Sequence, residues 1–128
     1  MQRRTFVVAG LLSSTFLSPS FAQQAVTVIY VGGWDCSFCR AWKNKFKADW
    51  LASKERGKVN YVEIDVPKLK DAYEERNWPK EYRAIREQLP SKFGTPRFIV
   101  AQNGKILSNE TGSGEWDRTI AKIRELVG

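Results

Sequence analysis

Two segments in the first half of the chain carry the apolar patterns of β-strands. Residues 25–33, AVTVIYVGG, form a nearly continuous run of β-branched and aromatic residues closed by two glycines. Such a run is typical of a strand buried in a parallel sheet. Residues 58–66, KVNYVEIDV, alternate with a period of two, which predicts a second strand. We expect Glu63 and Asp65 to be polar residues at the edge of that strand.

The segment between these strands has the period of a helix. An apolar stripe faces a row of lysines and arginines and predicts a helix from residue 36 to about 54, ended by Gly57. Two shorter helical pieces are expected at about 67–76 and 79–89, because Pro79 is tolerated in the first turn of a helix. The aromatic residues expected in the core are Trp42, Phe46, Trp50, Trp78 and Trp116.

The last third of the chain predicts a hairpin and a helix. Apolar residues 98–100 and 106–107 flank Asn103-Gly104, the dipeptide favoured in a type I′ turn. Ser113 is then in place to cap a helix whose apolar positions repeat with helical spacing. The predicted order is β-α-β-α-β-β-α, an α/β fold in which helices cover both faces of one mixed sheet of about four strands.

The N-terminal residues 1–22 have the pattern of a cleaved signal peptide. Arg3 and Arg4 precede an apolar stretch of about a dozen residues, too short to span a bilayer, and small residues stand near Ala22. The Arg pair also resembles a twin-arginine signal, although the general secretory route is equally open. We therefore expect cleavage near Ala22, a periplasmic location and one domain over residues 23–128.

The charge of the chain does not indicate a nucleic-acid partner. Its 21 lysines and arginines against 14 acids give a formal net charge of +7, and loss of residues 1–22 lowers it to +5. The basic residues are mixed with acids along the predicted helices, as on ordinary solvated surfaces. We expect a monomer that binds no nucleic acid.

The only two cysteines form a Cys-x-x-Cys motif at the start of the first predicted helix. There the unpaired N–H groups and the helix dipole favour a thiolate at Cys36. Cys39 follows one turn later and is placed to attack a mixed disulfide at Cys36. Arg40 adds positive charge to this turn, whereas Asp35 acts the other way. The hypothesis is an exposed nucleophile, Cys36, and a buried resolving thiol, Cys39.

The absence of histidine and of further cysteines excludes several other roles for the two thiols. A c-type haem site needs histidine where Arg40 stands, and a zinc site needs four ligands, whereas this sequence has two cysteines and no histidine. The absence of histidine also excludes Cys-His and Ser-His-Asp catalysis. A Cu(I)-binding protein and an adaptor with a small structural disulfide remain open. The motif beside a βαβ pattern favours redox chemistry without a metal or other cofactor.

The motifs together resemble the thioredoxin superfamily over nearly all of residues 23–128. VIYVGGWDCSFCRAWKNKF, GTPRFIVAQNGKIL and the terminal amphipathic helix carry the resemblance. It implies a thioredoxin-like fold in which Pro96 is cis and Thr95 offers backbone hydrogen bonds to an extended substrate. It also implies protein thiol or disulfide substrates and a membrane-bound redox partner that resets the cysteine pair.

The sequence departs from thioredoxin itself at several positions. Ser-Phe stands between the cysteines in place of Gly-Pro, and Tyr30 stands where thioredoxin has a buried proton-accepting aspartate. The pattern is more similar to exported bacterial thioredoxin-like proteins, including those associated with sulfur oxidation and with disulfide isomerisation. The sequence has no dimerisation domain of the isomerase type, which argues against autonomous isomerase activity.

These features predict an exported thiol–disulfide oxidoreductase. Cys36 and Cys39 form its redox-active pair, and Thr95 and Pro96 bind the substrate. Phe38 and Trp34 are further candidate substrate contacts, because Phe38 lies between the cysteines and Trp34 just before them. We expect the reductive direction on a client protein; a disulfide-introducing oxidant of the same fold is the alternative.

Overall fold

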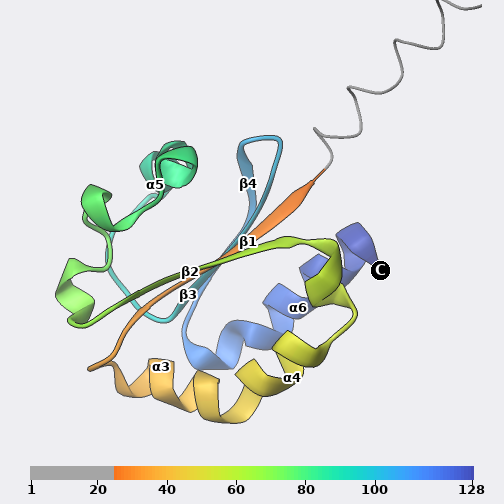
Figure 1. The fold of residues 1–128 in the computed structure, drawn as a ribbon, viewed down its shortest axis with the longest axis horizontal. Helices are drawn as coiled ribbons and strands as arrows, with labels where there is room; N and C mark the ends of the chain where they lie inside the picture. The colour runs from red at the N-terminus through yellow and green to blue at the C-terminus, as the bar shows by residue number, and fades with distance from the viewer. Residues whose placement is uncertain (1–24) are drawn as a thin grey trace, which may run out of the picture.

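The computed structural model describes residues 25–128, which form one four-stranded mixed sheet with helices on both faces (Figure 1). The predicted signal segment, residues 1–22, lies outside the described residues. The order across the sheet is β2-β1-β3-β4; β1 and β2 are parallel, and the other two pairs are antiparallel. This is the predicted α/β architecture. The strands are β1 (Val26–Gly33), β2 (Asn60–Val66), β3 (Arg97–Gln102) and β4 (Lys105–Thr111).

The hairpin between β3 and β4 turns at the predicted dipeptide. Asn103 and Gly104 both have positive φ, 54° and 77°, as a type I′ turn requires. The pairing shifts at a β-bulge between Val100 and Ala101. The Asn-Gly signal therefore located the turn correctly, and the turn sets the last two strands side by side.

The first helical segment covers most of the predicted range but is not uniform. It comprises α3 (Ser37–Trp42), a π-helical turn (Lys43–Lys47) and α4 (Ala48–Ala52). The helix ends at Ala52 rather than near residue 54, because Ser53 is extended and its hydroxyl donates to the Trp50 carbonyl at 2.7 Å. Gly57 lies in a separate 3-10 turn, Glu55–Lys58, so its predicted role as the helix end is wrong.

The region expected to hold two helices contains mostly 3-10 turns. These turns are Leu69–Asp71, Glu75–Asn77 and Lys80–Tyr82, and only Arg83–Gln88 forms an α-helix, α5. Trp78 is the reason: its side chain is 1 % exposed, and its indole N–H donates to the Ala72 carbonyl at 2.9 Å. The chain between Ala72 and Trp78 therefore turns back on itself in short 3-10 turns.

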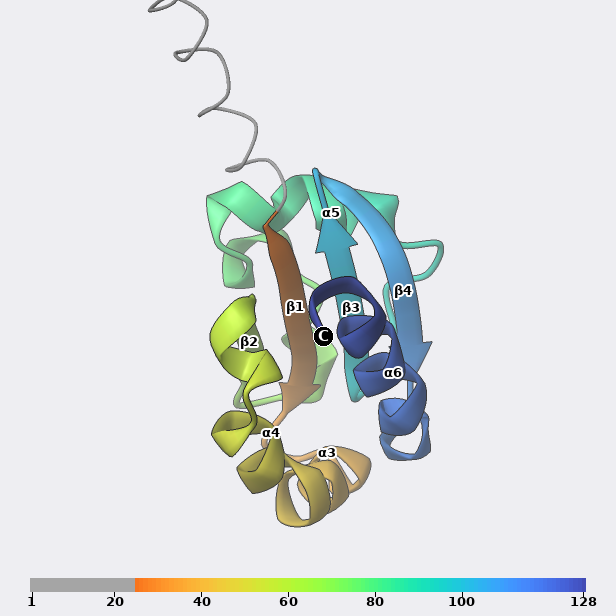
Figure 2. The same cartoon turned by 90° about the vertical axis from the view of Figure 1, so that its right-hand side faces the viewer.

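The C-terminal helix α6 (Trp116–Val127) begins later than predicted. Ser113 opens a 3-10 turn, Ser113–Glu115, and does not cap the helix; the residue at the helix start is Glu115, which makes no side-chain capping bond. Helix α6 lies against β3 and β4 (Figure 2), and its Trp116 and Ile123 are buried in the core on that side of the sheet. None of the helices among residues 25–128 is long and apolar enough to cross a membrane.

Two hydrophobic cores fill the two faces of the sheet. Alternating residues of β1 point to opposite sides: Tyr30 faces the core beneath α3, α4 and α6, and Ile29 faces the core beneath α5. The first core is rich in aromatic rings in edge and tilted contact. The expected core aromatics Trp42, Trp50, Trp78 and Trp116 are all buried, whereas Phe46 is half-buried.

Candidate active site

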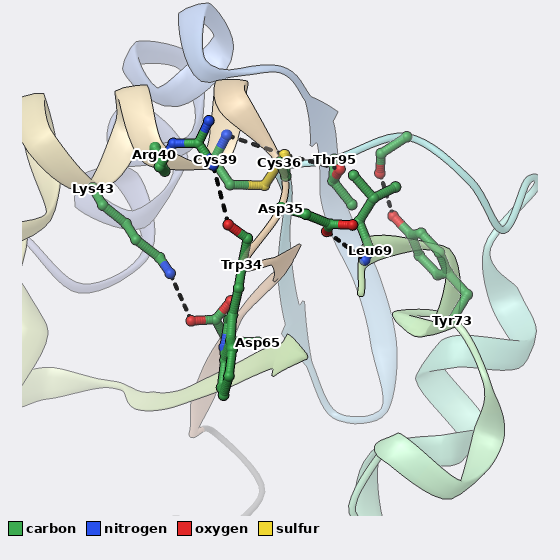
Figure 3. Close-up of a disulfide and its surroundings, with 11 residues drawn as sticks. Trp34, Asp35, Cys36, Cys39, Arg40, Lys43, Asp65, Leu69, Tyr73 and Thr95 are labelled. Carbon is green, nitrogen blue, oxygen red and sulfur yellow. Dashed lines mark hydrogen bonds and ion pairs between the residues drawn. A yellow bond between two sulfur atoms is a disulfide. The ribbon is translucent and has the colours of Figure 1, made fainter. Parts of the chain in front are cut away.

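Cys36 and Cys39 form a disulfide at the start of α3, with Cα atoms 5.2 Å apart (Figure 3). Cys36 is the N-cap residue: its backbone is extended, with φ −106° and ψ 112°, and its Sγ accepts a hydrogen bond from the Cys39 N–H at 3.1 Å. The first sulfur of the pair therefore occupies the place where a helix offers unpaired N–H groups. A thiolate at Cys36 is stabilised by the same groups after reduction.

The turn that carries Cys36 is fixed by a set of short contacts. Trp34 N–H donates to the Val66 carbonyl at 2.8 Å, which ties the turn to the end of β2. The Asp35 carboxylate accepts from the Leu69 N–H at 2.8 Å, and Arg40 donates to the Trp34 carbonyl at 3.1 Å. Arg40 and Asp35, expected to act on the cysteine charge, therefore both also hold the backbone of this turn.

Glycine at position 33 is required by the close approach of the next loop. A Cβ at Gly33 would lie 2.6 to 2.7 Å from the N, Cα and Cβ atoms of Leu69. Real Cβ atoms essentially never approach backbone atoms so closely. The second glycine that closes the strand motif thus allows the loop after β2 to pack against the redox turn.

Both cysteines are buried in the disulfide form. Cys39 is fully buried, as predicted, but Cys36 is only 4 % exposed, so the expectation of an exposed Cys36 is wrong for this state. Thr95 explains the difference, because its Oγ1 lies 3.2 Å from Cys36 Sγ and covers the sulfur (Figure 3). A disulfide sulfur carries no hydrogen, and therefore the Thr95 hydroxyl is the donor.

The Thr95–Pro96 peptide bond is cis, as the resemblance implied. A hydrogen bond from a phenol fixes the residue before Thr95: the Tyr73 hydroxyl donates to the Gly94 carbonyl at 2.6 Å. Gly94 has a φ of +97°, a conformation that glycine adopts readily. Gly112 N–H donates to the Pro96 carbonyl at 2.8 Å on the other side. The fold thus brings Thr95 to Cys36 from 59 residues away.

Three exposed aromatic side chains belong to the segments around the disulfide. Trp34 and Phe38, predicted as substrate contacts, are 62 % and 66 % exposed, so both are accessible to a partner. Phe93, which is 75 % exposed and lies two residues before Thr95, was not predicted. The only feature of the sequence that could have indicated Phe93 as a substrate contact is its closeness to the Thr-Pro dipeptide.

Behind the disulfide, polar groups on β1 and β2 face the redox helix. Asp65 pairs with Lys43 at 2.7 Å (Figure 3), and Glu63 pairs with Lys47 at 3.0 Å. The sequence predicts only that these carboxylates stand at the polar edge of a strand. In the structure they also bind the helical segment through the two lysines. Burial raises the pKa of the Tyr30 hydroxyl above its ordinary value, and the Asp65 and Glu63 carboxylates add to this shift. Among residues 25–128, no three side chains of the kind that bind metals converge.

Solved thioredoxin structures match this architecture. The thioredoxin of Malassezia sympodialis matches with a TM-score of 0.53 and 15 % identity, over 82 % of this chain and 81 % of that one. Spinach chloroplast thioredoxin f matches with a TM-score of 0.52 and 14 % identity, over 83 % and 80 %. Fasciola hepatica thioredoxin gives 0.51 and 20 %, over 89 % and 92 %. This protein has a thioredoxin-like fold.

The likeness is one of fold. No family model and no curated protein matches the sequence. Identities of 14 to 20 % are too low to carry activity or partners from the thioredoxins to this chain. Within the thioredoxin-like fold, the Cys36–Cys39 pair at disulfide distance is consistent with thiol–disulfide redox chemistry.

Proposed function

We propose that this protein is a thiol–disulfide oxidoreductase that reduces disulfides or mixed disulfides of a client protein. The observation that carries the redox part of the proposal is the asymmetry of the two sulfurs, whereas the reductive direction rests on the likeness of the sequence pattern to small single-domain exported proteins. Cys36 Sγ accepts hydrogen bonds from the Cys39 N–H at 3.1 Å and from the Thr95 hydroxyl at 3.2 Å. Two donors at the helix start stabilise a thiolate, and a structural disulfide has no need of them.

The reaction needs no cofactor beyond the dithiol. The Cys36 thiolate attacks one sulfur of the client disulfide, forms a mixed disulfide and expels the other client sulfur as a thiolate, which takes up a proton. The Cys39 thiolate then attacks Cys36 Sγ, closes the Cys36–Cys39 disulfide and expels the second client thiolate. Two electrons pass from the protein to the client, and a second dithiol must return them.

The surroundings of Cys36 support a protein substrate. Thr95 and Pro96 stand beside Cys36 as a candidate edge for an extended segment, and Trp34 and Phe38 expose apolar surface near it. We place the protein in the periplasm after cleavage of residues 1–22, as a monomer, with a membrane-bound partner that supplies electrons. The sequence pattern of residues 1–22 supports export, and the dispersed charge gives no support for a nucleic-acid partner.

Reduction of insulin disulfides by the mature protein with dithiothreitol tests the proposal. The wild-type protein should accelerate reduction, Cys36→Ser should abolish the activity, and Cys39→Ser should accumulate a mixed disulfide with the client. Ser37→Ala is the matched control, because it alters the same turn and keeps both sulfurs.

Absence of activity in the wild-type protein would overturn the reductase assignment. Stoichiometric binding of Cu(I) in competition with strong chelators would then favour the copper carrier. Efficient oxidation of reduced client thiols by the disulfide form, with negligible reduction, would reverse the proposed direction instead.

A further inference from the structure

Tyr30 carries a buried hydroxyl without a hydrogen-bond partner. Its side chain is 1 % exposed, and its ring stacks on Trp42 with centroids 4.9 Å apart, so the ring is fixed in place. Among residues 25–128, only four buried side-chain nitrogen or oxygen atoms have no partner, and the Tyr30 Oη is one of them. A buried, unpartnered hydroxyl destabilises the fold and requires an explanation.

The hydroxyl lies next to the sulfur of Cys39. The two atoms border the same small space, the one in which Gly32 would carry a Cβ: that Cβ would overlap the Tyr30 Oη and lie 2.9 Å from Cys39 Sγ. Any larger residue at position 32 would displace the hydroxyl or the sulfur. Because position 32 is glycine, the phenol and the second cysteine can both border this space.

The charges around this site keep the hydroxyl protonated. Asp65 is the β2 residue directly opposite Gly32, so it lies beside the same space. Its Oδ2 binds Lys43, whereas its Oδ1 is buried and has no partner. Burial and the nearby carboxylates raise the pKa of Tyr30, and a phenol that keeps its proton is a hydrogen-bond donor rather than a base. The titratable groups that face Tyr30 are Asp65, Glu63 and Tyr61 on β2 and Lys43 on the π-helical turn.

We propose that the Tyr30 hydroxyl donates a hydrogen bond to Cys39 Sγ once the disulfide is reduced, and so activates Cys39 for the resolving attack. In the disulfide form the hydroxyl has no partner, and Cys39 Sγ is held in place by its bond to Cys36 Sγ. Reduction breaks that bond and frees Cys39 Sγ to turn toward the phenol, for which a Cys39 thiolate is a better acceptor than the thiol. This inference rests on the proposed function.

The proton balance of the step is simple. The Cys39 thiol gives its proton to solvent, and the resulting thiolate keeps the hydrogen bond from Tyr30. The thiolate then attacks Cys36 Sγ in the mixed disulfide, and the expelled client thiolate takes up a proton. Tyr30 itself neither gains nor loses a proton. It lowers the fraction of Cys39 that is an unreactive thiol.

The direct test is the pKa of Cys39 in a variant where it is the only thiol. In the Cys36→Ser background, the ultraviolet absorbance of the thiolate gives this pKa with and without Tyr30→Phe. We expect Tyr30→Phe to raise the pKa of Cys39 by about one unit, about a tenfold loss of thiolate at neutral pH. Tyr82→Phe is the matched control, because Tyr82 packs against the core on the other face of the sheet.

A second measurement keeps the native phenol. In the same Cys36→Ser background, the tyrosine absorbance should shift as Cys39 titrates, because the hydroxyl gains a charged acceptor; the shift should vanish in Tyr30→Phe. An unchanged Cys39 pKa in Tyr30→Phe, or no tyrosine shift in the parent, would overturn the inference. The two failures can be told apart. A negative insulin assay would contradict the proposed function, whereas both titrations test the Tyr30–Cys39 hydrogen bond without any client.

Discussion

Arg97 is buried beneath the segment that presents Thr95, and its replacement should be one of the costliest in the protein. The side chain is 3 % exposed, and its guanidinium lies over the ring of Tyr73. It donates to four neutral acceptors. These are the Tyr73 hydroxyl at 2.6 Å, Asn109 Oδ1 at 2.8 Å, Ser91 Oγ at 3.2 Å and the Phe93 carbonyl at 2.6 Å.

The loss of unfolding free energy on replacing Arg97 can be worked out from these four hydrogen bonds and from the buried guanidinium charge that they stabilise. Arg97→Met keeps the aliphatic stem but leaves the four acceptors without their donor. Each buried acceptor left unpaired costs about 1–3 kcal/mol. Part of this cost is offset, because the variant no longer buries a charge, and three of the bonds are only partly buried. We expect a net loss of about 3 kcal/mol of unfolding free energy.

Urea unfolding of the oxidised protein measures this loss. A decrease of about 3 kcal/mol should lower the melting temperature by about 12 °C or more, given the size of the domain. Arg118→Met is the matched control: Arg118 is 75 % exposed and bonds only to Glu115, so we expect a change below about 0.5 kcal/mol. Insulin reduction by Arg97→Met should also fall, because the segment that places Thr95 on Cys36 is loosened. A stability within about 1 kcal/mol of the wild type would refute this reasoning.

Three further substitutions, one of them with a matched control, test separate contacts. Tyr30→Phe should stabilise the oxidised protein by about 1 kcal/mol in urea unfolding, because it removes a buried hydroxyl without a partner; destabilisation would contradict this. Gly33→Ala should cost about 2 kcal/mol or more in the same assay, because its Cβ would overlap Leu69. Gly57→Ala, whose Cβ meets nothing within 4 Å, should be nearly neutral. Thr95→Val should raise the pKa of the N-terminal cysteine of the pair by about one unit in a thiol titration, through loss of the hydroxyl donor; an unchanged value would show that the hydroxyl does not stabilise the thiolate.

Local patterns in the sequence were sufficient for the strands and for the position of the redox pair. The continuous apolar run of β1, the alternation of β2, the Asn103-Gly104 turn and the Cys-x-x-Cys motif at a helix start are each decided by residues close together in the chain. The physical constraints that produce them, side-chain period and backbone conformation, act over the same short range. The predicted four-stranded sheet and the helices α3, α4 and α6 are confirmed for this reason, whereas 3-10 turns stand where a helix was expected at about 67–76.

Contacts between distant residues account for what the sequence did not predict. Cys36 is buried because Thr95, 59 residues later, covers its sulfur. Short 3-10 turns stand where a helix was expected at about 67–76. In this region the Trp78 ring is buried in the core, and its indole N–H donates to the Ala72 carbonyl. Tyr30 and Cys39 can lie close together because Gly32 has no Cβ between them. This becomes apparent only when β1 is packed beneath α3.

The reduction potential of the Cys36–Cys39 couple in the mature protein tests the central claim most directly. Equilibration with glutathione and dithiothreitol buffers, followed by alkylation and mass measurement, gives the fraction of reduced protein at each potential. A reductase predicts a reversible two-electron transition near about −270 mV, the value of thioredoxin. A couple that stays oxidised below about −300 mV would be a structural disulfide and would contradict the redox function. A value near about −120 mV would identify an oxidant and contradict the proposed direction.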